Sequence, residues 1–267
     1  MRRIIIPIIA LLMFSCEEQD QNQSTNSENA IEALTEYAIV NKIFQDTGNN
    51  SGDTVLSAES TTTNKNSGLK TEAEITIEPL DYATFPKTIT INYGDGIVGQ
   101  DGVTRKGVVT IVSTNWYRAT GSEHTTTFNN FYHNEYLVEG THFTKNLGEN
   151  SDGNLQFEVT VTDGKITDTV GETINFTEDV LRTWIAGSTT PLNIWDDEYM
   201  LDGIQSGTST KGVNYELTIE ESLHFTLLPR NIESGILNVA LGSFTDIKIN
   251  YETSTITILG VSYPFGD

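Results

Sequence analysis

The segment KTITINY, residues 87–93, decides the fold of this chain. Threonine and isoleucine alternate in it, so the isoleucines point to one face of a strand and the threonines to the other. This alternation predicts a half-buried β-strand with an apolar inner face and a threonine-rich outer face. The same pattern stands before it in EITIE, residues 74–78, and after it in VVTIV, residues 108–112.

Alternating segments continue to the C-terminus, and turns rich in Gly, Asp and Asn separate them. Parallel strands would need long crossovers between these segments, and the sequence has no room for them. We therefore expect an all-β fold over residues 73–267, an antiparallel β-meander or sandwich. Asp163-Gly164, between two short alternating runs, is a typical hairpin turn.

A faint internal repeat runs through the β region. YLVEGT, residues 136–141, is echoed by YMLDGI, residues 199–204, and each copy leads to an alternating strand. One interpretation is two similar β units, residues 73–165 and 166–267. The other is that any meander with glycine turns resembles itself, and the sequence does not decide between them.

The N-terminal part of the chain has a different pattern. Apolar residues recur at helical spacing over residues 29–46, which predicts one amphipathic helix, capped by Asn29 and ended by Gly48. Residues 16–30 are polar and predict a flexible tether, whereas 31–72 predict this short helix and then a polar linker.

The first residues form an export signal. Residues 1–3 are MRR, residues 4–14 are apolar, and LMFSC at residues 12–16 resembles a lipobox. The apolar run is shorter than the roughly 20 residues that a transmembrane helix needs. We expect residues 1–15 to be removed and Cys16, the only cysteine, to carry a lipid such as palmitate. The alternative is an ordinary N-terminal element with a chance cysteine.

The charge of the chain limits its partners. The formal net charge is −22, and loss of Arg2 and Arg3 with the signal makes it more negative. Such a surface repels nucleic-acid phosphates and anionic headgroups, so we expect no nucleic-acid partner. Attachment to a membrane must then come from the lipid anchor.

Residues 85–220 carry motifs of a known group. They include FPKTITINYGDG at 85–96, DGVTRKGVVTI at 101–111, WYR at 116–118, TTFNNFY at 126–132 and VEGT at 138–141. Together these resemble an uncharacterised family of Bacteroidota surface lipoproteins with an extended β domain. The acidic residues 17–20 also resemble the signal that sends such lipoproteins to the outer face of the outer membrane. The resemblance implies export and an all-β fold, and it brings no catalytic residues.

Two acidic groups are candidates for cation binding. Asp95 and Asp101 stand in a glycine-rich loop, but Ca²⁺ needs six to eight oxygens, so a simple turn is the favoured interpretation. Residues 196–198, Asp-Asp-Glu, could bind a cation or act as paired carboxylates, and here a solvated turn is favoured.

The histidines offer a weaker signal. His124, His133 and His142 are nine residues apart, so two could face each other on neighbouring strands and bind a metal. Without a short-range pair such as His-x-His, isolated surface or half-buried histidines, His224 included, are favoured. The sequence also lacks nucleophile-elbow, Walker and dinucleotide motifs. We therefore expect no enzyme activity, no metal and no cofactor.

The aromatic residues 116–136 admit two interpretations. Trp116, Tyr117 and Tyr132 could form an exposed strip that stacks on sugar rings, but core packing is favoured. Separately, Asp-Thr-Val at 53–55 and 168–170 resembles O-glycosylation sites of exported Bacteroidota proteins, with Thr54 and Thr169 as acceptors.

These observations support one functional hypothesis and one alternative. The first is a lipid-anchored protein of the outer membrane, exposed at the cell surface, with a non-catalytic structural or binding role. The alternative is a glycan-binding module of a nutrient-capture system.

Overall fold

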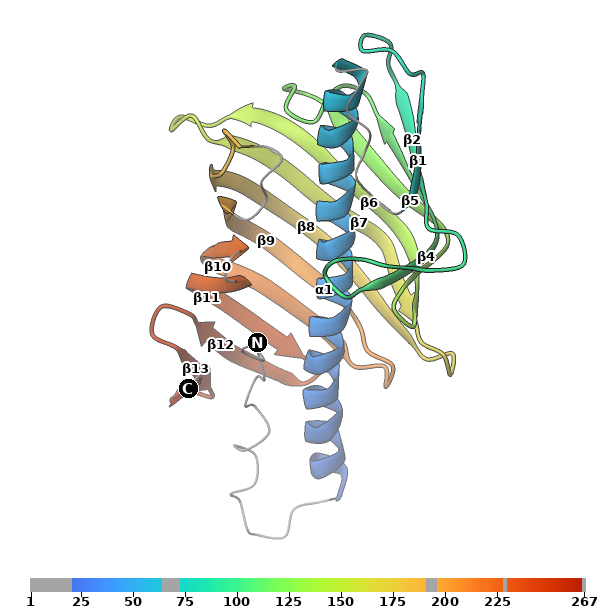
Figure 1. The fold of residues 1–267 in the computed structure, drawn as a ribbon. Coiled ribbons are helices and arrows are strands. Elements are labelled where there is room, and N and C mark those ends of the chain that lie inside the picture. The colour runs from blue at the N-terminus through green and yellow to red at the C-terminus, as the bar shows by residue number, and fades with distance from the viewer. Residues whose placement is uncertain (1–20, 64–72, 191–195, 228–229, 266–267) are drawn as a thin grey trace.

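The computed structural model describes residues 21–63, 73–190, 196–227 and 230–265. They form one helix and a single antiparallel sheet of fourteen strands (Figure 1). The strands pair in chain order, and only the short β3 leaves this path, to pair with β4. The predicted all-β antiparallel meander is therefore confirmed, and the sheet is one rather than the two of a sandwich.

The strands lengthen from the edges toward the middle of the sheet. They are β1 Glu74–Glu78, β2 Lys87–Asn92, β3 Ile97–Val98, β4 Thr104–Ser113, β5 Glu123–His133, β6 Tyr136–Glu149, β7 Leu155–Thr167, β8 Thr173–Ala186, β9 Glu198–Thr208, β10 Asn214–Leu227, β11 Arg230–Leu241, β12 Phe244–Asn250, β13 Thr255–Ile258 and β14 Val261–Pro264.

The sheet is continuous across the boundary that the internal repeat suggested. β7 spans residues 155–167 and therefore crosses the proposed division at 165/166. β7 and β8 pair along most of their length, so neither half has a separate sheet. The two suggested β units are therefore not separate sheets, because hydrogen bonding passes from each strand to the next without a break.

The repeated motif marks bends in the strands instead. Gly140 in β6 and Gly203 in β9 have φ of +111° and +137°. A Cβ on either glycine would lie 2.6 or 2.2 Å from a carbonyl oxygen of the adjacent strand. The two echoes therefore place glycine where a strand bends and neighbouring backbones approach closely.

The predicted hairpin at Asp163-Gly164 was also wrong. Both residues lie within β7, where the pairing with β8 shifts register between Val161 and Gly164. Asp163 has φ of +52°, so the positive φ serves a β-bulge while the strand continues. A turn and a bulge need the same residue types, and the sequence alone does not separate them.

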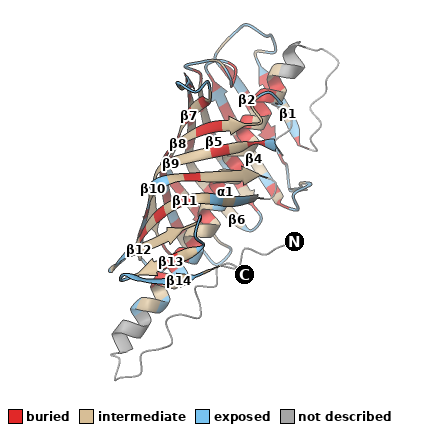
Figure 2. Ribbon diagram, turned by 90° about the vertical axis from the view of Figure 1, so that its left-hand side faces the viewer, coloured by how far each residue is buried: buried red, intermediate tan, exposed pale blue. Residues whose placement is uncertain are grey.

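Helix α1, Gln21–Thr63, crosses one face of the sheet, and the sheet curves around it (Figure 1). At 1.5 Å per residue its 43 residues span about 65 Å. The core lies between helix and sheet, where buried segments recur along the strands (Figure 2). Phe44, for example, stacks on Phe176 of β8 with ring centroids 5.2 Å apart.

The helix is much longer than the sequence predicted. The expected tether is helical from Gln21, and the expected linker is helical as far as Thr63. Gly48 lies inside the helix and does not end it. Its lack of a side chain has another reason, because a Cβ there would lie 2.4 Å from Nε2 of His142 on the sheet. Tertiary packing thus overrides the weak helix propensity of this segment.

Candidate functional site

An open pocket of about 520 Å³ lies where the C-terminal end of α1 meets two loops of the sheet. The β1–β2 loop contributes Tyr82 and Phe85, the β4–β5 loop contributes Trp116 and Arg118, and the helix contributes Glu59. We call this the aromatic pocket. Its full lining is Glu59, Tyr82, Ala83, Phe85, Asn115, Trp116, Arg118 and Ala119.

Three rings form the apolar part of the aromatic pocket. Trp116 is 5% exposed, and its ring centroid lies 5.1 Å from that of Phe85 and 5.4 Å from that of Tyr82. Its Nε1 donates a hydrogen bond to the backbone oxygen of Tyr82 at 3.2 Å, which ties the two loops together. Tyr82 is 47% exposed and presents its ring to solvent. Ring surface of this kind is available for stacking against a ligand.

A fully buried lysine holds the β1–β2 loop in place. Lys87 begins β2, and its Nζ donates hydrogen bonds to the backbone oxygens of Pro79 and Asp81. The same ammonium lies 5.0 Å from the ring centroid of Phe85 and 5.2 Å from that of Trp116. A buried charge is tolerated when it is hydrogen-bonded and faces aromatic rings. Lys87 therefore holds the β1–β2 loop and the rings of Phe85 and Trp116 in position.

The polar part of the aromatic pocket combines an acid, a base and an amide. Burial raises the pKa of the Glu59 carboxyl, while a hydrogen bond from Tyr82 Oη, at 3.4 Å, and the charge of Arg118 lower it. Asn115 and Arg118 are exposed at the other side. Such a set donates and accepts hydrogen bonds, and it suits a ligand with an apolar face and several hydroxyl groups.

The other two predicted stacking aromatics lie elsewhere. Tyr117 is 6% exposed and stacks on Phe157 at 5.0 Å, beneath α1. Tyr132 is half-buried on β5, with Nζ of Lys106 5.3 Å from its ring centroid. Core packing, the favoured interpretation, is therefore confirmed for Trp116 and Tyr117. The three residues do not form one exposed strip.

A second polar group lies beneath the helix, around Arg182 of β8. Its guanidinium donates to Oη of Tyr117 at 2.5 Å and to Oδ1 of Asn49 at 3.3 Å. It also lies 5.0 Å from the ring centroid of Tyr199. Asp197 accepts hydrogen bonds from that tyrosine, at 2.9 Å, and from Trp184, at 3.1 Å. These contacts join helix and sheet through polar groups.

Two carboxyl groups of this region titrate near neutrality. Burial raises the pKa of Asp53 to about 7, with the Asp197 carboxylate acting in the same direction and Arg182 opposing. Burial likewise raises the pKa of Glu178 to about 7, against a hydrogen bond that Gln205 Nε2 donates at 2.5 Å. Perturbed carboxyls are typical of catalytic clefts, but these two are buried between α1 and the sheet, Asp53 on the helix and Glu178 on β8.

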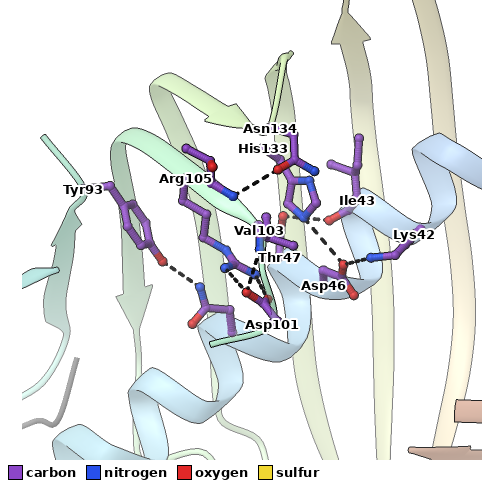
Figure 3. Close-up of polar contacts among 12 residues, drawn as sticks. Lys42, Ile43, Asp46, Thr47, Tyr93, Asp101, Val103, Arg105, His133 and Asn134 are labelled. Atoms are coloured by element: carbon purple, nitrogen blue, oxygen red, sulfur yellow. Dashed lines mark hydrogen bonds and ion pairs between the residues drawn. The ribbon is translucent and has the colours of Figure 1, made fainter. Parts of the chain in front are cut away.

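The proposed Ca²⁺ loop is closed by a basic side chain. Asp101 forms two hydrogen bonds with the guanidinium of Arg105, at 2.6 and 3.1 Å, and accepts a third from the backbone of Val103 (Figure 3). These bonds from Arg105 and Val103 hold the pKa of Asp101 below its usual range. Asp95 is exposed in the turn before it. Asp95 and Asp101 therefore lie in turns, as the favoured interpretation predicted, and Asp101 in addition forms an ion pair with Arg105.

The acidic residues 196–198 have three separate partners. Asp196 accepts a hydrogen bond from Thr190 Oγ1 at 2.7 Å, and Glu198 lies 2.8 Å from His224 Nε2. Asp197 is 5% exposed, so the prediction of a solvated turn was wrong for it. Its burial is explained by the two donors in the core that it satisfies.

Three of the four histidines are buried, contrary to the favoured interpretation. His124, His133 and His142 are 3%, 3% and 5% exposed, because they face α1 or the loop beside it. Burial lowers the pKa of His124 to about 4, and burial with the nearby Arg182 lowers that of His142 to about 4. Among the described residues, no three His, Cys, Asp or Glu side chains are placed to hold a metal.

The predicted modification sites have different environments. Cys16 and the export signal lie outside the described residues. Thr54 is buried on α1, and its hydroxyl donates to the backbone oxygen of Asn50 at 2.7 Å, so a glycan could not reach it in the folded chain. Thr169 is exposed in the β7–β8 turn and remains a predicted acceptor.

Sequence reasoning missed Tyr82, Phe85 and Lys87 as parts of one site. The signal is DYATFPK at residues 81–87, where two aromatic residues flank a short loop before a strand.

No family model, curated protein or solved structure matches the chain. In the described part of the chain, no helix has the length and apolar character needed to span a bilayer.

Proposed function

We propose that this chain is a lipid-anchored protein of the cell surface whose role is to bind a ligand rather than to catalyse a reaction. The observation that supports this proposal is the long distance along α1 between its N-terminal end, next to the proposed anchor, and the aromatic pocket. Glu59, which lines the aromatic pocket, stands 38 residues after Gln21, about 57 Å along the helix.

The order of residues orients the molecule on a membrane. Only residues 17–20 lie between the proposed acylation site, Cys16, and Gln21, where the described part of α1 begins. The five Cα–Cα steps from Cys16 to Gln21 reach at most about 18 Å, so this end of the helix would lie close to the lipid surface. The helix would then carry the aromatic pocket to the distal end, where it meets ligands outside the cell.

The composition of the aromatic pocket favours binding over catalysis. It offers one carboxyl group, Glu59, whereas glycoside hydrolysis uses a pair. The carboxyls with pKa values near 7, Asp53 and Glu178, lie under the helix instead. Lys87 and Trp116 hold the rings in place without a ligand, as a preformed binding site requires.

The anchor is tested by metabolic labelling with a clickable palmitate in the native type of host. We expect the parent to be labelled and Cys16→Ser to be unlabelled and released from membranes. Equal labelling of both forms would overturn the anchor. Protease added to whole cells should cleave the anchored protein, whereas complete protection would overturn surface exposure.

One observation supports the glycan-binding alternative: the exposed ring of Tyr82 packs against the ring of Trp116. It is tested by intrinsic fluorescence titration with oligosaccharides of glucose, xylose, mannose and galactose. Tyr82→Ala should weaken binding at least tenfold, while Tyr132→Ala, a half-buried tyrosine outside the pocket, should leave it unchanged. Equal effects of the two substitutions would rule out the pocket.

A further inference from the structure

A hollow of about 870 Å³ lies on the face of the sheet opposite α1 and crosses six strands, from β6 to β11. We call it the outer groove. On the helix side of the same strands, Phe176 stacks on Phe44 and Tyr215 packs on Tyr37. Their neighbours Asn175, Thr177 and Glu216 point the other way and are exposed.

Strand register arranges the side chains of the outer groove in two rows. One row runs Glu139, Lys165, Asn175, Thr208 and Asn214, each residue paired with the next across adjacent strands. The second row runs Thr177, Ser206, Glu216 and Ala240 in the same way.

Two glycines form part of the floor between the rows. Gly164 and Gly207 line the outer groove with backbone atoms, because a Cβ on either would point to the helix side, toward Phe44 or Tyr215, and would lie 2.5 or 2.0 Å from a neighbouring backbone oxygen. Neighbouring backbones therefore approach closely at these two residues. Six strands about 4.8 Å apart make the groove about 24 Å long. The hollow therefore has the length of several units of a polymer.

The chemistry of the two rows suits hydroxyl groups. Thr177 is bonded to Ser206 at 2.8 Å, and Thr208 to Asn214 at 3.0 Å, and each hydroxyl keeps further hydrogen-bonding capacity. Within the described residues, the Asn175 amide and the Glu216 carboxylate have no hydrogen-bonded partner, so both are available to a ligand.

Charge narrows the class of ligand. Glu139, Asp163 and Glu216 line the outer groove with Lys165 as the only base, and Lys165 is already paired with Glu139 at 2.6 Å. A polyanion would be repelled. Apart from Ala240, every side chain of the two rows is polar or charged, so the rows present no apolar cluster that would dock a lipid or a hydrophobic peptide.

We propose that the outer groove binds a linear, uncharged, hydroxyl-rich polysaccharide, with Asn175 and Glu216 as its principal hydrogen-bonding residues. This site is separate from the aromatic pocket, which lies at the C-terminal end of α1. The groove would hold a chain along its length, whereas the pocket would hold a single ring.

Affinity gel electrophoresis of the full chain tests this proposal, with dextran, xyloglucan, galactomannan and the polyanion polygalacturonate in the gel. We expect at least one neutral polymer, and not polygalacturonate, to retard the protein. Asn175→Ala with Glu216→Ala should weaken that retardation at least tenfold. The control, Asp179→Ala with Thr218→Ala, removes one acid and one neutral group from exposed positions of the same strands and should change it less than twofold.

Three results would overturn the proposal: no retardation by any neutral polymer, stronger retardation by polygalacturonate, or equal retardation of the groove variant and its control. Tyr82→Ala separates the two sites. If it alone abolishes polymer binding, the aromatic pocket is the binding site and the groove proposal fails. If only the groove variant loses polymer binding, the groove proposal stands, and the oligosaccharide titration alone decides the glycan-binding role of the pocket.

Discussion

The central part of helix α1 packs on the sheet in two ways. Over residues 40–44, its first half, the contacts are made by large apolar side chains, whereas over residues 47–54, its second half, they are made by glycines and polar groups. Apolar burial resumes at Val55. In the first half, Val40, Ile43 and Phe44 are almost fully buried against the strands. In the second half, Gly48 and Gly52 approach His142 and Tyr117, and Asn49 bonds Arg182. The first half gains stability from burial, whereas the second half gains close, specific fit.

The second half shows how a polar segment can remain helical while it is buried against a sheet. Thr47, Ser51 and Thr54 are buried, and each hydroxyl donates to the carbonyl oxygen four residues earlier, at 2.7, 2.9 and 2.7 Å. The hydroxyls are thereby satisfied inside the helix, and their burial needs no partner on the sheet.

The largest expected effect is in the apolar half. Phe44→Ala removes a ring that stacks on Phe176 and contacts Phe128, so the free energy of unfolding should fall by about 3–5 kcal/mol. Urea denaturation followed by circular dichroism measures it. Lys42→Ala on the exposed side of the same turn is the control, with a change of about 0.5 kcal/mol or less. A small loss for Phe44→Ala would mean that the apolar half does not dominate.

The next effect is a clash in the polar half. Gly48→Ala would place a Cβ 2.4 Å from Nε2 of His142, so it should destabilise by about 1–3 kcal/mol although alanine favours helices. His142→Ala removes the obstacle. In a double-mutant cycle, Gly48→Ala should therefore cost much less in the His142→Ala background. Additive effects would show that the approach of helix and sheet is not limited by this contact.

A pH-dependent effect follows from Asp53. Because its folded pKa is about 7 and its usual value is lower, the folded chain binds a proton that the unfolded chain has released. This contribution to stability is present at about pH 4 and is lost as pH rises through 7. Asp53→Asn should match the parent near pH 4 and exceed its stability by about 1–2 kcal/mol at pH 8.

Only the difference between variant and parent isolates Asp53. Glu178, with a pKa raised to about 7, has the same sign, whereas His124 and His142, with pKa values lowered to about 4, add stability as pH rises from 4 to 6.5. Denaturation curves of both proteins at pH 4, 6 and 8 measure that difference. A constant difference across this range would contradict the buried carboxyl.

The smallest expected effect is at Ser51. Its hydroxyl bonds the backbone of its own helix, so Ser51→Ala breaks no bond to the sheet, and alanine has the higher helix propensity. We expect a change within about 0.5 kcal/mol of zero. Thermal unfolding measures it beside Gly48→Ala. A loss as large as that of Gly48→Ala would mean that hydroxyls, rather than glycines, control the fit of this half.

Much of the fold could be predicted, and the reason is periodicity. Alternation in segments such as residues 87–93 requires one buried and one exposed face, and short connections require antiparallel neighbours. The apolar first half of α1 was predicted for the same reason. The second half and the bulge at Asp163-Gly164 were not, because glycine and polar residues have the same local preferences in linkers, turns and bulges.

The candidate sites were less predictable. Trp116 was singled out as an aromatic, but its partners Tyr82 and Phe85 stand more than thirty residues earlier, and Lys87 joins them only in space. The outer groove depends on register, which places Asn175 opposite Thr208 and Glu216 opposite Ser206. No local pattern specifies either arrangement.

The sequence by itself determined the class of fold, the strongly negative charge and the position of the one thiol that a lipid could occupy, since each is a property of residues taken in order. Only the tertiary structure decided how far the helix extends, which aromatic rings are buried and which strands share a groove. These depend on contacts between residues distant in the chain, and the free energy of such contacts exceeds the small differences in local propensity.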